Sequence, residues 1–157
     1  MIQRIQTVFL ALVVLLGVAA SFFPILTFTS DGASYLMNLY KTVASDELTN
    51  ILTKNMGVGA MQGIVQLTAL ATLLLFKNRS LQIKIGKLTI LLIAFQIAAI
   101  VMYSDTVKSL MGTHPEEIIV AFNFGAILPV LSLICAYLAV HFIKKDDQLV
   151  RSADRLR

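Results

Sequence analysis

Charged side chains are absent from four long apolar stretches of this 157-residue sequence. The stretches comprise residues 5–28, 58–76, 88–103 and 118–143. Ionisable side chains at membrane depth are the usual mark of proton relays, ion pathways and substrate counter-ions. Their absence argues against a proton-coupled transporter, including the small multidrug exporters, which need a carboxylate within a span.

Cysteine is nearly absent as well, because Cys135 is the only one and it lies in the fourth apolar stretch. A single thiol forms no intrachain disulfide and supports no paired-thiol redox chemistry. This excludes the four-helix membrane oxidoreductases that pass disulfides to quinones.

Residue patterns typical of catalysis or metal binding are also missing. The sequence shows no Ser/His/Asp set, phosphate-binding loop, paired carboxylates or metal-ligand spacing, so we expect no catalytic residue, no metal, no cofactor and no enzymatic activity. A membrane enzyme remains an alternative, because His114 lies near Glu116 and Glu117 and offers ligands for a metal. His141 is at the other end of the fourth stretch and cannot join that group.

The composition is that of a membrane protein. Hydrophobic residues make up 57% and charged residues 14% of the chain, with a mean hydropathy of +0.81, whereas soluble domains have about 45–50% and about 25%. A helix needs about 20 residues to cross the hydrocarbon core, and the four stretches contain 24, 19, 16 and 26. We therefore predict an all-α fold, a four-helix up-down transmembrane bundle forming one domain over residues 1–157. The expected spans are about 5–28, 57–76, 86–105 and 117–143, followed by a cytoplasmic tail helix over 144–157.

Positive charges are divided unevenly between the segments that join these spans. Ten of the thirteen Lys and Arg precede the first span, lie between the second and third, or follow the fourth. These ten are Arg4, Lys77, Arg79, Lys84, Lys87, Lys144, Lys145, Arg151, Arg155 and Arg157. The remaining segments hold only Lys41, Lys54 and Lys108. The positive-inside rule therefore predicts that both termini are cytoplasmic, with the basic segments facing anionic lipid headgroups, and no nucleic-acid partner is expected.

Local patterns refine this topology. The N-terminus also resembles a signal peptide cleaved after Ala20, but apolar residues continue to Phe28, which favours a retained first span. Ser45 and two following acids predict a short interfacial helix before the second span, and residues 35–40 are expected to dip into the interface. A capping box over residues 113–116 predicts the start of the fourth span, in which Pro129 predicts a bend facing a neighbouring helix.

Uncharged polar residues occur within the predicted spans. Those with amide side chains that we single out are Gln62 and Gln66 in the second, Gln96 in the third and Asn123 in the fourth, and Thr68 and Ser132 are further examples. Gln66 and Gln96 are both expected near the midplane, where they can bond to each other. We interpret the four side chains as contacts between helices; the alternative is a cavity for a polar substrate or water. The small residues at 59 and 63 favour close helix packing within the chain, with dimerisation as the alternative.

Four segments of the chain, above all its two ends, resemble a known family. The segments that carry the resemblance are MIQRIQTVFL, KNRSLQIKIGKL, GAILPVLSL and the closing KKDDQLVRSADRLR. They are similar to the domain-of-unknown-function 4293 family, small four-helix membrane proteins of Bacteroidota. The resemblance implies a multi-pass protein of the bacterial inner membrane, and it supplies no activity and no catalytic residues.

The charged termini and the tail suggest a function. A tail of alternating charge is more specific than attraction to lipid requires, so we expect a non-enzymatic scaffold or accessory subunit that docks a cytoplasmic or membrane protein. The residues expected on this face are Arg4, Lys77, Arg79, Lys84, Lys87, Leu149, Arg151, Asp154 and Arg155. Two alternatives stay open: a small carrier or channel for a neutral or lipidic solute, and a tail that only anchors the bundle at the lipid surface.

Overall fold

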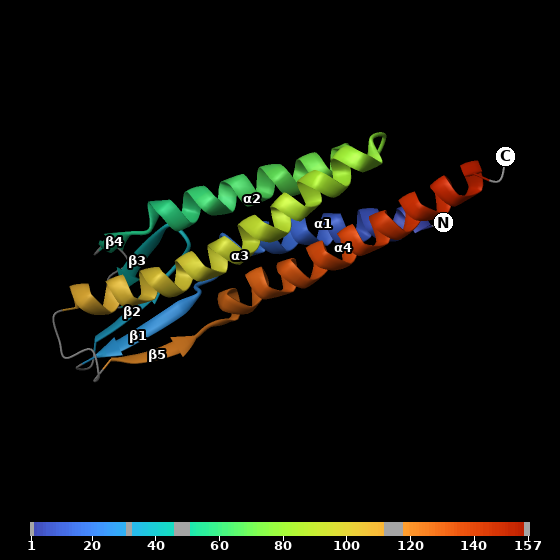
Figure 1. The fold of residues 1–157 in the computed structure, drawn as a ribbon. Coiled ribbons are helices and arrows are strands. Elements are labelled where there is room, and N and C mark those ends of the chain that lie inside the picture. Colours follow the sequence, from blue (N-terminus) through green and yellow to red (C-terminus); the bar gives the residue numbers. More distant parts are fainter. Residues whose placement is uncertain (1, 31–32, 46–50, 112–117, 156–157) are drawn as a thin grey trace.

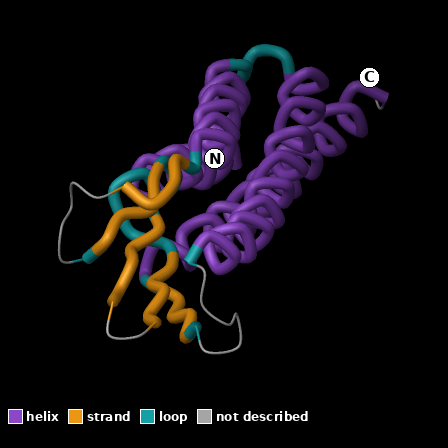
Figure 2. Tube along the Cα trace, turned by 90° about the vertical axis from the view of Figure 1, so that its left-hand side faces the viewer, coloured by secondary structure: helices purple, strands orange, loops and turns teal. Residues whose placement is uncertain are grey.

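The computed structural model describes residues 2–30, 33–45, 51–111 and 118–155 of the chain. It contains four helices and five strands within these ranges. In chain order they are α1 (Ile2–Ala20), β1 (Leu26–Ser30), β2 (Ala33–Met37), β3 (Lys41–Ala44), β4 (Ile51–Lys54), α2 (Met56–Leu74), α3 (Arg79–Leu110), β5 (Ile119–Phe122) and α4 (Phe124–Arg155). The helices lie side by side and the strands gather at one end of them, as Figures 1 and 2 show.

The helices form the larger part of the molecule. Helix α1 packs against α2 and α4, and α3 packs against the same two helices. Both chain termini and the α2–α3 connection lie at the end of the bundle opposite the strands (Figure 1). We call this the terminal end and the opposite one the sheet end.

Among the described residues, three helices are long and apolar enough to cross a membrane. They are Met56–Leu74, Arg79–Leu110 and Phe124–Val150, with mean hydropathies of 1.4, 2.2 and 2.3. The first predicted span differs, because its apolar helical part ends at Ala20 and is shorter. Large apolar side chains cover the outside of the bundle: Leu67 and Met102, for example, are 71% and 72% exposed, while Gln62 and Gln96 are buried inside. A hydrocarbon surface around a partly polar interior is suited to contact with lipid.

The prediction of an all-α fold was wrong at the sheet end. Five antiparallel strands form one sheet there, in the order β4-β3-β2-β1-β5. Strand β1 follows Pro24 and alternates buried Leu26 and Phe28 with more exposed neighbours, which is the period of a strand. The first span was therefore drawn too long, and strand β5 occupies part of the segment predicted to begin the fourth span.

The first long connection also differs from its prediction. Strand β4 includes Ile51 and Leu52, at the end of the segment expected to hold an interfacial helix, and β2 includes part of the 35–40 run. Residues 46–50, and the capping box predicted over 113–116, lie outside the described residues. Short strands pair here because a sheet satisfies main-chain groups that an isolated helical turn would leave without partners.

The sheet and the bundle share one core. Phe28, Met37, Leu39, Val58 and Val107 are fully buried in a single cluster that joins strands to α2 and α3. Main-chain bonds fix the junction, since the Ile25 N–H donates to the Met37 carbonyl at 2.8 Å. The sheet is therefore held rigidly against the helix ends, and the pockets at that end have fixed walls.

Candidate functional site

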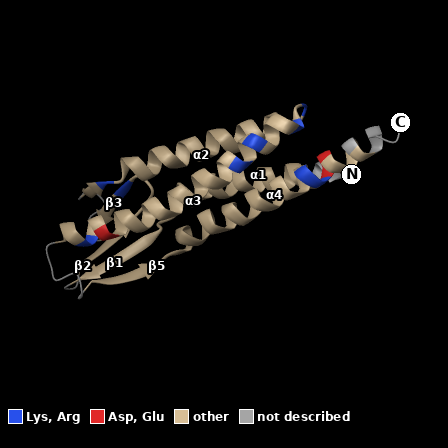
Figure 3. Cartoon of the chain, in the orientation of Figure 1, with Lys and Arg blue, Asp and Glu red and all other residues tan. Residues whose placement is uncertain are grey.

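Many of the described Lys and Arg residues lie toward the terminal end, as the blue segments in Figure 3 show. Lys77 follows α2, and Arg79, Lys84 and Lys87 lie in the first turns of α3. The side chain of Asn78 caps α3 by accepting a hydrogen bond from the Leu81 N–H at 3.3 Å, which fixes the start of this basic segment. The side chains of Arg4, Arg151, Asp154 and Arg155 lie outside the described residues.

One ion pair joins the basic connection to the tail. Arg79 Nη1 lies 3.3 Å from Asp146 Oδ2, and the two side chains are 27% and 15% exposed. Arg79 Nη1 has no hydrogen bond of good geometry, so the contact is electrostatic. Because α3 and α4 are far apart in sequence, their charge pattern alone did not reveal this contact. It links the start of α3 to α4 at the base of the tail.

A small polar cavity lies beside this ion pair. Its volume is about 130 Å³, and it is lined by Gln6, Thr7, Phe76, Arg79 and Gln82. Gln6 Nε2 donates to the Phe142 carbonyl at 3.1 Å and Gln82 Nε2 to the Thr72 carbonyl at 3.0 Å. These amides hold α1 to α4 and α3 to α2, so the terminal end is a fixed polar surface.

The tail continues α4 beyond the bundle. Figure 1 shows the last turns of α4 extending past the ends of α1 and α2. Leu149 and Val150 are 50% and 42% exposed there. Two adjacent apolar side chains on a polar helix form a surface that another molecule can cover.

Two of the four polar residues expected within the spans form a buried network. Gln96 Nε2 donates to Gln62 Oε1, and Gln62 Nε2 donates to the Gly17 carbonyl at 2.8 Å. The network connects α1, α2 and α3. Gln66, which we expected to bond to Gln96, lies against Gly17, and its amide atoms have no hydrogen-bond partner. The register of α2 on α3 places Gln62, one turn nearer the sheet, opposite Gln96.

The alternative of a polar cavity lined by these four side chains does not match the space found beside them. The space beside Gln62, Gln96 and Ser132 measures only about 10 Å³, about the size of one water molecule. Asn123 lies apart from it, at the junction of the sheet and α4, where its Nδ2 donates to Thr27 Oγ1 at 2.7 Å. A polar solute therefore has no room beside these glutamines.

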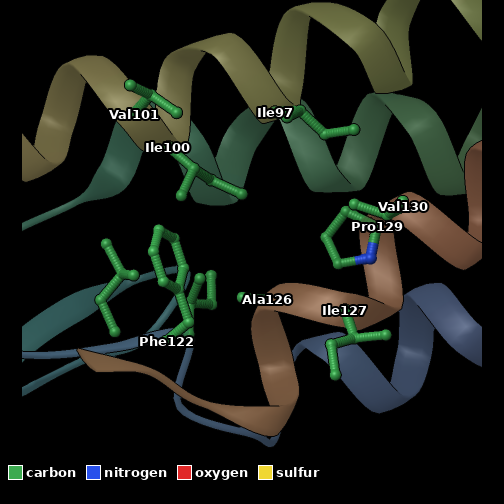
Figure 4. A pocket seen from close by; sticks show the side chains of 10 residues that line it. Ile97, Ile100, Val101, Phe122, Ala126, Ile127, Pro129 and Val130 are labelled. Carbon is green, nitrogen blue, oxygen red and sulfur yellow. The ribbon is translucent and has the colours of Figure 1, made fainter.

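An apolar pocket lies between α3, the start of α4 and the sheet. Its volume is about 340 Å³. Figure 4 shows Ile97, Ile100 and Val101 of α3 facing residues of β5 and α4 across the opening. Pro129 contributes its ring to the wall and is buried, consistent with the expectation that it faces protein. Every lining side chain is hydrocarbon, so this pocket accepts only apolar groups.

A second pocket at the sheet end has a different chemistry. It measures about 330 Å³ and is lined by Ser21, Asn38, Tyr40, Lys41, Ile51, Lys54 and Met56. Lys41 and Lys54 are partners across strands β3 and β4. The sequence separates them by thirteen residues, and only the hairpin brings them to one place.

No cluster suited to a metal occurs in the described ranges, where no three His, Cys, Asp or Glu side chains come together. His141 is exposed and stacks on Tyr137 at a centroid distance of 6.4 Å. His114, Glu116 and Glu117 lie outside the described residues.

No curated protein matches the sequence. A family model described as a domain of unknown function, DUF4293, matches residues 2–156. Since this match covers nearly the whole chain, the protein belongs to the DUF4293 family.

Proposed function

We propose that this protein is a multi-pass protein of the bacterial inner membrane and that its terminal end faces the cytoplasm. Three helices with the length and composition of membrane spans support the first part. The collection of basic residues at the terminal end supports the second (Figure 3). Lys77, Lys84 and Lys87 would then lie near the anionic headgroups of the inner leaflet.

We further propose that the terminal end docks a protein partner, as a non-enzymatic scaffold or accessory subunit. The observation that carries this proposal is the tail of α4, which projects past the bundle with Leu149 and Val150 exposed. The tail continues the same helix as the packed part of α4, and the Arg79–Asp146 ion pair links its base to α3. A pre-oriented helix loses less conformational entropy when a partner covers it than a free segment does. A tail that only lies on lipid would need no such fixed direction.

Replacing Leu149 and Val150 by aspartate should release the partner. Burying two half-exposed apolar side chains contributes enough free energy that the amount of partner retained should fall at least about tenfold. The measurement is quantitative co-purification after mild extraction from cells. Gln148→Asp with Ser152→Asp is the matched control, because it adds the same charge at exposed polar positions of the same helix.

Two outcomes would count against docking. One is an unchanged set of stoichiometric partners in the Leu149→Asp, Val150→Asp variant. The other is the absence of any tail-dependent partner, combined with binding of the tail to anionic vesicles that the two aspartates abolish. The second result would assign the tail to the lipid surface instead.

A small carrier for a lipidic solute is the second candidate, and the apolar pocket favours it over a carrier for a polar one. Val101 lines this pocket and is 57% exposed, so Val101→Trp should fill part of it. In reconstituted vesicles, protein-dependent transfer of a fluorescent single-chain lipid should then fall to the protein-free rate. Met102→Trp is the control, because Met102 is exposed but does not line the pocket. Equal transfer with and without the wild-type protein would remove this candidate.

A further inference from the structure

Lysine is scarce at the sheet end, yet two of its three lysines meet in one pocket. Lys108 is paired with Asp105, whose Oδ1 lies 3.5 Å from Lys108 Nζ. Lys41 and Lys54 are Cα partners on β3 and β4 and both are exposed. Neither has an acidic partner among the described residues. Like charges directly opposite each other destabilise an antiparallel pair, so an anion placed between these two would stabilise the hairpin.

The main chain behind the two lysines is fixed. Asn55 is fully buried next to Lys54, and its Nδ2 donates to the Asn38 carbonyl at 3.0 Å and to Thr42 Oγ1 at 3.1 Å. The Asn38 N–H donates to the Lys41 carbonyl at 2.9 Å. These bonds hold the base of the hairpin in one geometry. The spacing of the two lysine backbones is therefore set before any ligand arrives.

The rest of the pocket is apolar. Tyr40, Ile51 and Met56 line it and are 43%, 47% and 66% exposed. Tyr40 is held in place, because its hydroxyl donates to Ser21 Oγ at 3.3 Å and its ring lies against Gly59. The pocket thus has two cationic groups beside a hydrocarbon wall, and it suits a ligand that is anionic at one end and apolar at the other.

The position of the pocket identifies the source of such a ligand. Ser21 directly follows α1, which ends at Ala20, and Met56 is the first residue of α2. The pocket therefore lies at the level where the apolar helices end. In a membrane this is the depth of the lipid phosphates. The N-terminus of α2 also places the positive end of a helix dipole at this level.

We propose that this pocket binds the phosphate of an anionic phospholipid of the phosphatidylglycerol type. The phosphate lies between the ammonium groups of Lys41 and Lys54, and the first carbons of the lipid lie on Ile51 and Met56. This inference rests on the membrane placement proposed above but not on the docking of a partner. The site is distinct from the basic terminal end, because it lies at the other end of the bundle (Figure 3).

A fluorescence-quenching experiment on the full chain in nanodiscs tests the site. A fluorophore is attached at Ala60→Cys, in a background carrying Cys135→Ala; Ala60 is exposed and lies one turn along α2 from Met56. The nanodiscs contain phosphatidylcholine with a varied fraction of spin-labelled phosphatidylglycerol or spin-labelled phosphatidylcholine. Each lysine near a membrane surface is expected to favour the anionic lipid about fivefold. Half-maximal quenching should therefore need at least about fivefold less spin-labelled phosphatidylglycerol than spin-labelled phosphatidylcholine.

Variants decide whether Lys41 and Lys54 cause the preference. Lys41→Gln with Lys54→Gln should abolish it, and Lys41→Arg with Lys54→Arg should retain it. Lys108→Gln should also retain it, because Lys108 lies outside the pocket. Circular dichroism of each variant checks that the fold is kept.

Each remaining result would overturn the proposal in an identifiable way. Equal quenching by the two lipids would show that the pocket does not select phosphatidylglycerol. A preference that persists in the glutamine variant would place the selectivity elsewhere. Loss of the preference on adding inorganic phosphate would assign the pocket to a free anion. Absence of quenching by either lipid would contradict the membrane placement as well, whereas the co-purification experiment on the tail is independent of all four results.

Discussion

Replacing Gly125 by alanine should lower the free energy of unfolding by about 1–3 kcal/mol, the usual range for overpacking a filled site. A Cβ at Gly125 would lie 2.4 Å from the Pro24 carbonyl oxygen, 2.8 Å from the Pro24 carbonyl carbon and 2.9 Å from the Phe23 carbonyl oxygen. These are main-chain atoms, so no side-chain rotation can relieve the overlap. The Gly125 N–H also donates to the Pro24 carbonyl at 3.1 Å, and a displaced helix start would weaken this bond.

The expected loss of stability in the Gly125→Ala variant has a structural cause at the junction of bundle and sheet. The chain leaves α1 through Phe23 and Pro24, and α4 begins against that segment. Pushing the two apart would also strain the bond from the Asn123 N–H to the Ile25 carbonyl, now 2.9 Å long. We therefore expect the sheet end to separate from α4 before the helices separate from one another.

Gly63→Ala is the matched control for this measurement. A Cβ at Gly63 would meet nothing within 4 Å, so the change should be neutral or stabilise the helix by up to about 1 kcal/mol. Both variants are compared by equilibrium unfolding in mixed micelles, followed by circular dichroism. Equal stability of the Gly125→Ala and Gly63→Ala proteins would contradict the close packing at Gly125.

The bundle was largely predictable from the sequence because two simple signals determine it. Long uncharged stretches indicate apolar helices, and three of them are long enough to be spans. The unequal distribution of Lys and Arg predicted that the basic segments share one end, and Figure 3 shows the described Lys and Arg of the α2–α3 connection and of α4 toward the terminal end. Both signals persist over many residues, so small errors in the boundaries do not change the result.

The sheet was missed because its strands are short and two of them continue apolar runs. Hydrophobicity alone does not distinguish a buried strand from the end of a helix. The available signals were local: Pro24 ends the helical stretch, Thr27 and Thr29 alternate with apolar residues, and Ile119 and Val120 are β-branched. These features favour strands, but they are short and lie within continuous apolar runs, which predict helices when read alone.

The lysine pocket at the sheet end and the buried glutamine network depend on contacts between distant segments. A single sequence does not reveal such contacts. Pairing of Lys41 with Lys54 needs the register of β3 on β4. The contact of Gln96 with Gln62 needs the axial position of α3 relative to α2, and a shift of one turn would have selected Gln66. The predicted third span begins about seven residues after the start of α3, which is more than one helical turn. The predicted bounds therefore could not distinguish these two partners.

Gln62→Leu is the second substitution with a large expected effect. Gln62 is 3% exposed, accepts from Gln96 Nε2 and donates to the Gly17 carbonyl at 2.8 Å. Gly17 lies in the last turn of α1, where carbonyls lack helical donors, and its carbonyl also accepts a longer bond from Ser21 Oγ at 3.3 Å. The leucine variant would therefore leave the buried Gln96 amide without its acceptor and remove the shorter of these two bonds at the end of α1, and we expect it to lose about 1–3 kcal/mol of unfolding free energy.

A double-mutant cycle separates the hydrogen bonds from the change in packing. Gln96→Leu leaves only Gln62 Oε1 without its donor, so it should cost less than Gln62→Leu. The double variant Gln62→Leu, Gln96→Leu should lose less than the sum of the two single losses, because no unpaired glutamine amide then remains. A coupling of about 0.6–1.7 kcal/mol is expected, as for other hydrogen bonds between membrane helices.

Gln66→Leu is the control for the hydrogen bonds of Gln62. Gln66 belongs to the same helix, one turn from Gln62, and both of its amide atoms are buried without hydrogen-bond partners. Its replacement by leucine removes an unsatisfied polar group and should leave the protein equally stable or more stable. If Gln66→Leu destabilised the protein as much as Gln62→Leu, the measured losses would reflect packing volume. The hydrogen-bonded glutamines would then contribute nothing specific to holding α1, α2 and α3 together.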